Sequence, residues 1–484
     1  MPLNNLHSSR SSYPHRVIII MIVIAGYKYP MNSLFLDISL YCASFLFVST
    51  DQEVKASEKI KNHGSSPRCC DCGSWNFWPY NLLGTSQAKS KFWCRLGIRS
   101  LVLESFDSLR TTGFALAIWT NAWRALDALG IGNDIRQQHQ ALHGNVAFSR
   151  ISGLQMFEKS YDVKGKLGDH EVYCVKRKLL LETLARELPN GTIRFSSKVV
   201  SIEESGYFKL VHLADGTILK AKVLVGCDGV NSVVAKWLGF KKPVFKGRSA
   251  VRGCADFNSS HGFDPKFMQY FGNGIKTGTI PCDDKTVYWF FGWYPSNQEE
   301  ELKKNPAQLK QYMLSKLGKV SDEVRAVVEN TDLDAFRAAP VTYRHPWELL
   351  WGNISKGNVC VAGDALHPMV PDIGQGGCAA LEDGVVLARF LGEALLKNQE
   401  QENKDKGEEG KEKYKRIEMG LNKYASERKW RSIDLTSTSS VVSYIQVADG
   451  GKITAFLRDK IFAPILTWLL FKKADYDCGK LRSP

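Results

Sequence analysis

The fold is decided by the stretch Gly357-Asn358-Val359-Cys360-Val361-Ala362-Gly363-Asp364-Ala365-Leu366-His367-Pro368. Its apolar residues predict a buried strand that delivers one carboxylate, Asp364, to its carboxyl end. A loop rich in proline and glycine follows, reaches Gly374-Gln375-Gly376-Gly377 and leads into a helical segment at residues 379–396. Ligands of open α/β sheets bind beyond the carboxyl ends of the strands, and glycines let the backbone approach them closely. The stretch therefore predicts a cofactor site, although a Gly-Asp pair after a strand can also be a plain turn.

The composition is that of a globular protein. The chain has 484 residues, of which 44% are hydrophobic and 24% are charged, and this length suggests two or three domains. The net charge of +14 would suit a nucleic acid or an anionic membrane. The basic residues are spread along the chain, however, and the sequence carries no zinc-finger or RNA-binding motif. We therefore expect a solvated basic surface and no nucleic-acid partner.

The twelve cysteines are scattered. Cys69, Cys70 and Cys72 cluster near His63, but a zinc site needs a second pair at the right spacing. We expect no metal site, and the scatter favours a reducing compartment.

Residues 1–94 read differently from the rest. Residues 17–25 form an apolar run that is too short to span a bilayer, and residues 34–48 form a second run that contains Asp37. A signal anchor or a chloroplast transit peptide fits this composition. A cytoplasmic protein with peripheral membrane contact is the alternative.

A regular pattern begins at Arg95. Residues 97–104 predict a strand that ends on Glu104, and residues 176–188 predict an amphipathic helix that begins with Lys176-Arg177. Residues 219–225 predict a strand that ends in Gly226-Cys227-Asp228-Gly229. Gly272-Asn273-Gly274 resembles the start of a dinucleotide loop, but its flanks are aromatic and strand-like, so we expect a hairpin in a second sheet.

Taken together, these motifs resemble the FAD-dependent aromatic hydroxylase superfamily, the para-hydroxybenzoate-hydroxylase-like flavoprotein monooxygenases. The likeness covers about residues 95–481 and looks closest to plant monooxygenases related to zeaxanthin epoxidase and to salicylate-hydroxylase-like proteins. It implies FAD as cofactor, with NAD(P)H and dioxygen as co-substrates. It also implies hydroxylation or epoxidation of a small aromatic or isoprenoid-like substrate through a flavin hydroperoxide. A related flavin reductase that forms no hydroperoxide is the rival enzyme.

The resemblance implies an α+β fold. A Rossmann-like, parallel-sheet α/β domain would bind FAD, an antiparallel β-sheet domain would bind the substrate, and C-terminal helices would pack outside. The expected segments are an atypical N-terminus (1–94), the FAD-binding domain in two parts (95–240 and 346–396), the substrate domain (241–345), a charged linker (397–417) and a C-terminal helical region (418–484).

The resemblance also carries roles to individual residues. Glu104 would accept hydrogen bonds from the adenosine ribose. Arg110 would bind the diphosphate or a phosphate of the nicotinamide nucleotide, and Arg177 would contact the diphosphate or ribose of FAD. Asp364 would bind the ribityl chain of the flavin. The cofactor-binding residues implied in this way are Glu104, Arg110, Arg177, Asp228, Gly229, Gly363, Asp364, Pro371, Gly374, Gln375, Gly376 and Gly377. No catalytic triad or metal is implied, and His367 is a weak candidate for a proton relay against a structural role.

The chain departs from the family pattern in three places. Ala235 stands where many members carry Arg, and Cys378 stands where many carry Asn. The family's Gly-x-Gly-x-x-Gly loop should lie near residues 76–94, which contain one glycine, Gly84. Residues 17–26 look like a strand that ends in glycine, but they lie far from Glu104 in the sequence. We therefore expect the first, interior strand of the sheet to be missing, which would expose two strand edges.

Two explanations of the missing loop compete. Residues 1–94 could stem from an error in the gene model, such as an intron read as coding. Otherwise the chain is a catalytically impaired relative with weak or no FAD binding, which acts as a binding or membrane-associated protein.

Overall fold

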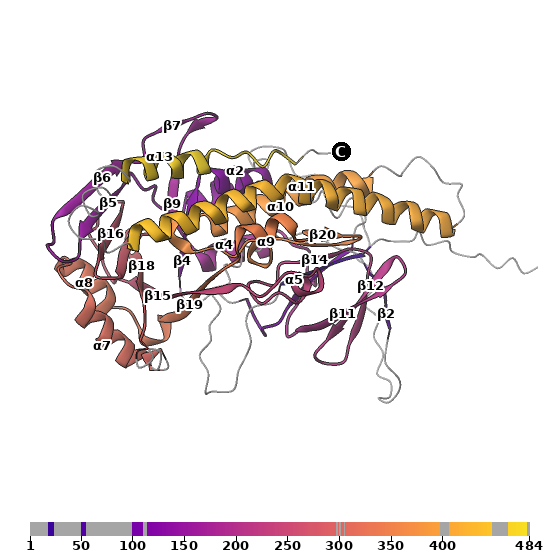
Figure 1. Ribbon diagram of the computed structural model, residues 1–484, viewed down its shortest axis with the longest axis horizontal. Coiled ribbons are helices and arrows are strands. Elements are labelled where there is room, and N and C mark those ends of the chain that lie inside the picture. Colours follow the sequence, from indigo (N-terminus) through magenta and orange to yellow (C-terminus); the bar gives the residue numbers. More distant parts are fainter. Residues whose placement is uncertain are drawn as a thin grey trace, which may run out of the picture.

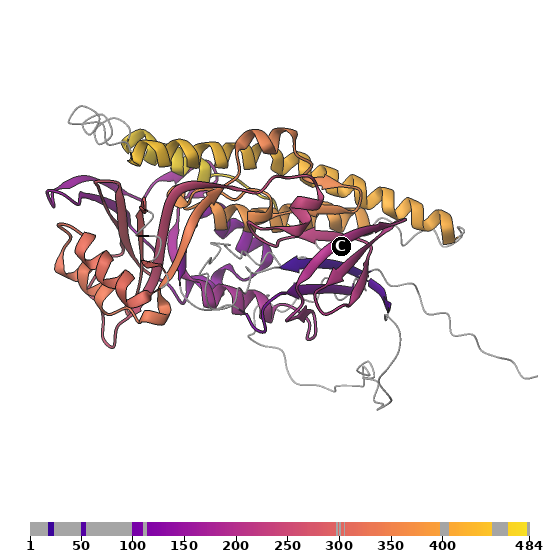
Figure 2. The same ribbon diagram turned by 60° about the horizontal axis from the view of Figure 1, so that its bottom comes forward.

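The computed structural model describes residues 18–23, 50–54, 99–109, 114–296, 299, 302–303, 305–396, 406–447 and 463–481. Two large sheets lie at opposite ends of the molecule, and the long helix α11 (Lys406–Val447) runs along one side past both (Figure 1). The view in Figure 2 shows the same arrangement from another side, with α11 again along one side. The fold is the expected α+β type.

The first sheet is mostly parallel. Its strand order is β10-β3-β1-β14-β21-β20, and only the pair of β20 and β21 is antiparallel. Leu224, Val359 and Val361 are fully buried, as expected for a parallel sheet covered on both faces. The strands are β10 (Ile193–Arg194), β3 (Arg99–Glu104), β1 (Ile18–Val23), β14 (Leu224–Gly226), β21 (Val359–Val361) and β20 (Ser355–Lys356).

The expectation that an interior strand is missing is wrong. Strand β1 lies between β3 and β14 and pairs in parallel with both, with Val23 opposite Glu104 and Ile22 opposite Gly226. The prediction treated the long sequence distance between β1 and β3 as evidence against their pairing. A long connection does not prevent pairing, because the entropic cost of closing a loop grows only slowly with its length. The uncharged segment 17–25 suits a strand position that is flanked on both sides. Gly26, residues 76–94 and the cysteine cluster at residues 69–72 lie outside the described residues.

A smaller antiparallel sheet packs beside the parallel one. Its order is β11-β12-β13-β2, so β2 joins it from the N-terminal segment. Its strands are β11 (Val199–Ser205), β12 (Phe208–Leu213), β13 (Ile218–Ala221) and β2 (Thr50–Val54).

The third sheet has seven strands in the order β19-β15-β18-β17-β16-β5-β6. All its pairs are antiparallel except that of β5 and β16. Strands β5 and β6 precede residue 241, so this sheet draws on more of the chain than the segment expected for the substrate domain. The strands are β19 (Arg337–Tyr343), β15 (Val244–Asp256), β18 (Thr286–Trp293), β17 (Ile275–Pro281), β16 (Lys266–Gly272), β5 (Gly144–Ser149) and β6 (Gln155–Ser160).

The expected hairpin is confirmed at the turn between β16 and β17. Asn273 and Gly274 adopt φ angles of 50° and 69°, the left-handed values that a tight two-residue turn between antiparallel strands requires.

One face of the seven-stranded sheet is a hydrophobic core. Trp289, Phe291 and Trp293 of β18 pack against α7 (Pro306–Lys316) and α8 (Asp322–Glu329). Because side chains alternate along a strand, the residues between them face the other side. That opposite face lines the cavity described below.

The remaining elements connect and cover the sheets. Phe471 of α13 packs on the rings of Trp119, Tyr161 and His170, so one face of this helix is docked. The helix α11 begins inside the segment 397–417 that was expected to be a linker. Among the described residues, the helices include none with the length and apolarity needed to cross a bilayer. The other elements are β4 (Ala115–Trp119), β9 (Val172–Lys176), β7 (Lys164–Gly165), β8 (Gly168–Asp169), α2 (Thr120–Leu129), α3 (Gly132–Arg136), α4 (Arg177–Arg186), α5 (Val233–Trp237), α9 (Pro346–Trp351), α10 (Gly376–Leu396), α13 (Ala463–Ala474), η1 (Leu333–Ala335), η2 (Gly363–Ala365) and η3 (Pro371–Ile373).

Candidate functional site

The two carboxylate-bearing turns meet at one edge of the parallel sheet. Strands β14 and β21 are neighbours, and the backbone N–H of Ala362 donates to the carbonyl oxygen of Gly226 at 3.0 Å. Asp228 and Asp364 follow directly after these two strands. Val230 and Asp364 line the same cavity. Segments more than a hundred residues apart in the sequence therefore form one site.

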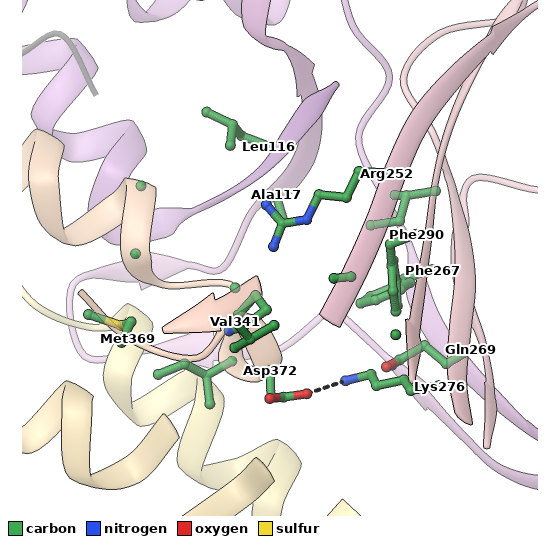
Figure 3. A pocket seen from close by; sticks show the side chains of 18 of the residues that line it. Leu116, Ala117, Arg252, Phe267, Gln269, Lys276, Phe290, Val341, Met369 and Asp372 are labelled. Atoms are coloured by element: carbon green, nitrogen blue, oxygen red, sulfur yellow. Dashed lines mark hydrogen bonds and ion pairs between the residues drawn. The ribbon is translucent and has the colours of Figure 1, made fainter. Parts of the chain in front are cut away.

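The cavity has a volume of about 220 Å³ and lies between the loop that follows β21 and the seven-stranded sheet (Figure 3). Residues of β4, such as Leu116 and Ala117, form another wall. The lining is mostly apolar, with a few polar groups, as is typical of small-molecule sites. Its aromatic members are Trp119, Phe157, Tyr161, Phe267, Phe271, Tyr288 and Phe290.

The register of the sheet places the lining residues in rows. One row runs Ala250, Gly292, Lys276 and Phe271 across strands β15, β18, β17 and β16. The next row on the same face starts at Arg252 and continues through Phe290, Gly278, Gln269 and Ala147. Apart from Gly278, all members of both rows line the cavity.

Three charged side chains form a buried ion cluster in the cavity wall. The guanidinium of Arg248 donates to both carboxylate oxygens of Asp372, at 3.1 and 2.6 Å. Lys276 Nζ lies 3.2 Å from Asp372 Oδ1, and Figure 3 shows this ion pair. Burial raises the pKa of Asp372, but Lys276 and Arg248 outweigh burial and hold it below its usual range. Burial also lowers the pKa of Lys276, and the negative charge of Asp372 offsets part of this decrease.

Sequence reasoning missed this cluster. The available signal was a cation within a predicted strand, Arg248 in β15 and Lys276 in β17. Pairing with an acid of the loop was not readable from the sequence.

The loop after β21 is fixed at its start by Asp383 of α10. The Asp383 carboxylate accepts hydrogen bonds from the backbone N–H of Gly363 at 2.7 Å and from Arg428 Nε at 2.5 Å, and His367 Nε2 lies 2.7 Å from Asp383 Oδ2. All three side chains are fully buried. Gly363 adopts a left-handed φ of 59°, which glycine accommodates without strain. His367 contacts this network and is not part of the cavity lining, so the geometry favours its structural role.

The end of the loop is fixed by Glu382. Asn121 Nδ2 donates to Gln375 Oε1 at 2.8 Å and to Glu382 Oε1 at 2.5 Å. Arg431 of α11 pairs with Glu382 at 2.6 Å. Adjacent acids of α10 thus hold the two ends of the loop, and arginines of α11 balance their charge. Sequence reasoning missed this network as well.

Asp228 caps a helix. Its carboxylate accepts hydrogen bonds from the hydroxyl of Ser232 and from the backbone N–H of Val233 at 2.6 Å, at the start of α5. Burial raises the pKa of Asp228 to about 6, although these hydrogen bonds act in the opposite direction. Gly229 follows with a left-handed φ of 73°.

Most of the other predicted cofactor residues lie in the cavity wall. The residues concerned are Asp364, Pro371, Gly374, Gly376 and Gly377.

Glu104 and Arg177 lie apart from this lining. Glu104 ends β3 and accepts a hydrogen bond from the backbone N–H of Phe106 at 3.0 Å. Arg177 begins α4, is buried, and lies 5.3 Å from the ring centre of Phe114. Arg110 lies outside the described residues.

The cavity fits the flavin end of FAD. Trp119 Nε1 is a buried donor that finds no hydrogen-bond partner among the described residues, and Trp119 lines the cavity beside Gly374. A Cβ atom at Gly374 would come within 3.1 Å of Trp119 Nε1, so glycine keeps this approach open. The first residues of α10, Gly376 and Gly377, line the cavity at the positive end of the helix dipole. A planar ring system with carbonyl acceptors and a developing negative charge suits this helix end and the indole N–H of Trp119.

Comparisons with known proteins agree with this fit. A family model described as an FAD binding domain matches residues 87–409. Monooxygenase 2 of Arabidopsis thaliana is 53% identical over 391 residues, which cover 80% of this chain and 93% of the relative. Monooxygenase 1 of the same plant is 34% identical over 396 residues, covering 80% and 94%.

Solved structures show the same fold. Klebsiella pneumoniae HpxO complexed with FAD and uric acid matches with a TM-score of 0.64 at 21% identity, over 81% of this chain and 95% of that chain. The tetracycline destructase Tet(51) matches with a TM-score of 0.58 at 15% identity, over 96% and 100%.

The family match covers most of the chain, and the relatives are monooxygenases over nearly their whole length. Monooxygenases act on a small molecule and dioxygen, and the comparisons do not favour the alternative of an impaired binding protein. The chain therefore belongs to the FAD-dependent aromatic hydroxylase-like superfamily and is an FAD-dependent monooxygenase.

Proposed function

We propose that this monooxygenase uses NAD(P)H and dioxygen to hydroxylate or epoxidise a small aromatic or isoprenoid-like molecule held in the cavity. The observation that carries this proposal is the position of the cavity. It lies between the loop with Asp364, where a flavin would bind, and an aromatic sheet face that could hold the substrate. FAD reduced by NAD(P)H supplies the activated oxygen atom, and the protein supplies binding, orientation and a dry environment.

The predicted cofactor residues would divide this work between the two ends of FAD. Glu104 would accept hydrogen bonds from the adenosine ribose, and Arg110 and Arg177 would bind the diphosphate. Asp228 and Gly229 would position their turn near both FAD and the nicotinamide nucleotide. Their support is the location of Glu104 and the Asp228 turn at the carboxyl ends of β3 and β14.

The loop residues would serve the flavin end. Asp364 would accept hydrogen bonds from the ribityl hydroxyls, and Pro371 with residues 374–377 would lie beside the ring. The N-terminus of α10 would stabilise negative charge on the reduced ring.

The protein would protect the reaction by excluding water. The aromatic lining and the C-terminal residues Ile445 and Leu470, which also line the cavity, would keep the reacting oxygen species from being lost as hydrogen peroxide. No proton-transferring side chain is required in this scheme. His367, held by Asp383, would only shape the loop.

The test is a purified protein assayed in two stages. A bound flavin should give a yellow protein, and a substrate screen that follows NAD(P)H consumption should then find compounds that accelerate it. Labelled dioxygen should place one labelled oxygen atom in the product. A yellow protein that oxidises NAD(P)H without labelling any product would indicate a flavin reductase, and a colourless protein that FAD does not stabilise would reject the proposal.

A further inference from the structure

We propose that the protein docks on an anionic membrane surface through exposed aromatic and basic side chains where β15, β19 and α9 meet. This aromatic–basic patch consists of Lys241, Lys242, Val244, Phe245, Lys246, Tyr343, His345, Trp347 and Trp351. The inference goes beyond the proposed function, because it concerns the surface on which the protein works and does not depend on the substrate.

Large apolar side chains of the patch are open to solvent. Trp347 and Trp351 are 55% and 76% exposed, and Val244 and Phe245 are 41% and 47% exposed. Trp351 follows Trp347 by one turn of α9, so both side chains lie on the same side of this helix. Exposure of so much clustered apolar area to water is unfavourable and marks a binding surface.

Contacts between neighbouring residues make the patch continuous. Val244 of β15 lies opposite Tyr343 of β19. The ring centre of Tyr343 lies 4.9 Å from that of His345, and His345 stacks on Trp347 with ring centres 4.0 Å apart. The start of β15 and the start of α9 therefore contribute to one surface.

Lysines surround these aromatic rings. Lys241 and Lys242 are exposed, and Lys246 Nζ lies 5.0 Å from the ring centre of Tyr343. The carbonyl oxygen of Lys241 accepts a hydrogen bond from Arg344 Nη1 at 2.8 Å. This bond holds the basic segment beside the residues that lead into α9.

The net charge of the patch favours an anionic partner. Residues 241–247 and 343–351 contain four basic side chains and one acid, Glu348, so their net charge is +3. The carboxylate of Glu348 lies 3.4 Å from the guanidinium of Arg344, which is fully buried. The three lysines are therefore left to attract an anionic surface.

Tryptophan beside lysine suits a lipid surface better than a protein partner. In a membrane interface, aromatic rings lie at the level of the headgroups, and lysines attract anionic lipids. Protein–protein interfaces also favour tryptophan, but they are depleted of lysine. A symmetric contact with a second copy of this chain would bring the lysines of two patches together, which the repulsion of like charges opposes.

The patch adjoins the wall of the cavity. Thr342, which lies opposite Phe245 in the sheet, lines the cavity, and so does Arg248, three residues after Phe245 in β15. Docking through the patch would place this wall of the cavity next to the lipid surface.

The experiment measures co-sedimentation of the FAD-loaded full chain with lipid vesicles. One set of vesicles holds equal parts of phosphatidylglycerol and phosphatidylcholine, and the other holds phosphatidylcholine alone. We expect the anionic vesicles to bind at least about tenfold more tightly, because each lysine near such a surface strengthens binding about fivefold. Raising the salt concentration from about 0.1 to about 0.5 M should weaken this binding.

Two variants test the two components of the patch. Combining Lys241→Gln, Lys242→Gln and Lys246→Gln should weaken binding to anionic vesicles by roughly 30- to 100-fold. Combining Trp347→Ser with Trp351→Ser keeps every charge and should weaken binding by at least about tenfold, because it removes apolar area that would enter the headgroup layer. Urea unfolding checks that each variant folds, and either variant alone decides the matter if the other does not fold.

Each variant has a matched control outside the patch. Trp430→Ser removes a tryptophan of α11 that is 66% exposed. Lys285→Gln removes an exposed lysine from the turn between β17 and β18. Neither control should change vesicle binding.

Several results would overturn the inference. The protein could fail to sediment with vesicles, or bind both kinds equally. A folded patch variant could bind as the wild type does, and loss of binding in Trp430→Ser alone would place the lipid contact on α11. A dimer found by ultracentrifugation without lipid, and lost when Trp347 and Trp351 are replaced, would assign the patch to a second copy of the chain instead.

Discussion

Replacing Asp383 by Asn should destabilise the protein through the loop that holds the candidate flavin site. The Asp383 carboxylate is fully buried and joins Gly363, His367 and Arg428. An amide of the same size keeps the packing but removes the negative charge. Arg428 keeps its pair with Glu382 at 2.8 Å, so its charge does not become isolated.

The size of the effect follows from the buried charges. Burial raises the pKa of Asp383, but His367 and Arg428 outweigh it and bring the pKa to about 2, against an ordinary value of 3.8. At about 1.4 kcal/mol per pKa unit, this shift corresponds to about 2.5 kcal/mol of stability. Removing one partner of a buried ion pair costs about 3–5 kcal/mol in other proteins. Because Arg428 still pairs with Glu382, which it shares with Arg431, we expect a loss of about 3 kcal/mol for Asp383→Asn.

The assay is urea unfolding of the wild type and the variant at pH 7 and at lower pH. A depressed carboxyl pKa contributes stability that is present above the ordinary value, near pH 4, and that is lost as the pH falls towards 2. The difference between the two proteins should therefore shrink below pH 4.

The matched control is Asp434→Asn, because the Asp434 side chain is 45% exposed in its pair with Lys473 and should matter by at most about 1 kcal/mol. If Asp383→Asn were no more destabilising than this control, the network would not be what fixes the loop.

Three further predictions concern single residues of the site. Asp364→Asn should raise the dissociation constant for FAD about 10- to 100-fold in a fluorescence titration, because it weakens hydrogen bonds to a charged acceptor; an unchanged constant would contradict the assignment. Burial raises the pKa of Asp228 to about 6, so FAD-free protein should lose about 2 kcal/mol of stability as the pH rises from 4 to 6. Asp228→Asn should abolish that slope in urea unfolding, and an equal slope in the variant would refute the cause. Gly374→Ala should cost about 1–3 kcal/mol in the same assay, since φ is 61° and the new Cβ would lie 3.1 Å from Trp119 Nε1; wild-type stability would show that the loop is not constrained there.

The sequence predicted the elements whose signals are local. The stretch around Asp364 predicted a buried strand, a glycine loop and a helix, and all three are present as β21, the loop through Gly374 and α10. The turn at Asn273 could be predicted because tight hairpin turns need left-handed backbone angles, which asparagine and glycine adopt most readily. These features depend on a few neighbouring residues, so a single sequence contains them.

Features that depend on distant pairing were missed. The position of β1 depends on hydrogen bonds to β3 and β14. The residue types at positions 17–25 do not identify the strands with which this segment pairs. The same holds for Asp372, whose partners Arg248 and Lys276 lie on strands that meet it only in the folded chain. A charged residue in an apolar strand signals that a partner exists, but it does not identify the partner.

The division of β18 between core and cavity explains why the site can change without loss of the fold. Trp289, Phe291 and Trp293 pack on α7 and α8, while Phe290 and Gly292 face the cavity from the same strand. A substitution on the cavity face alters the volume or charge of the cavity and leaves the packed face intact. The aromatic richness of this strand is therefore mainly a property of the core. The volume and charge of the cavity depend on the few polar and glycine positions of the opposite face.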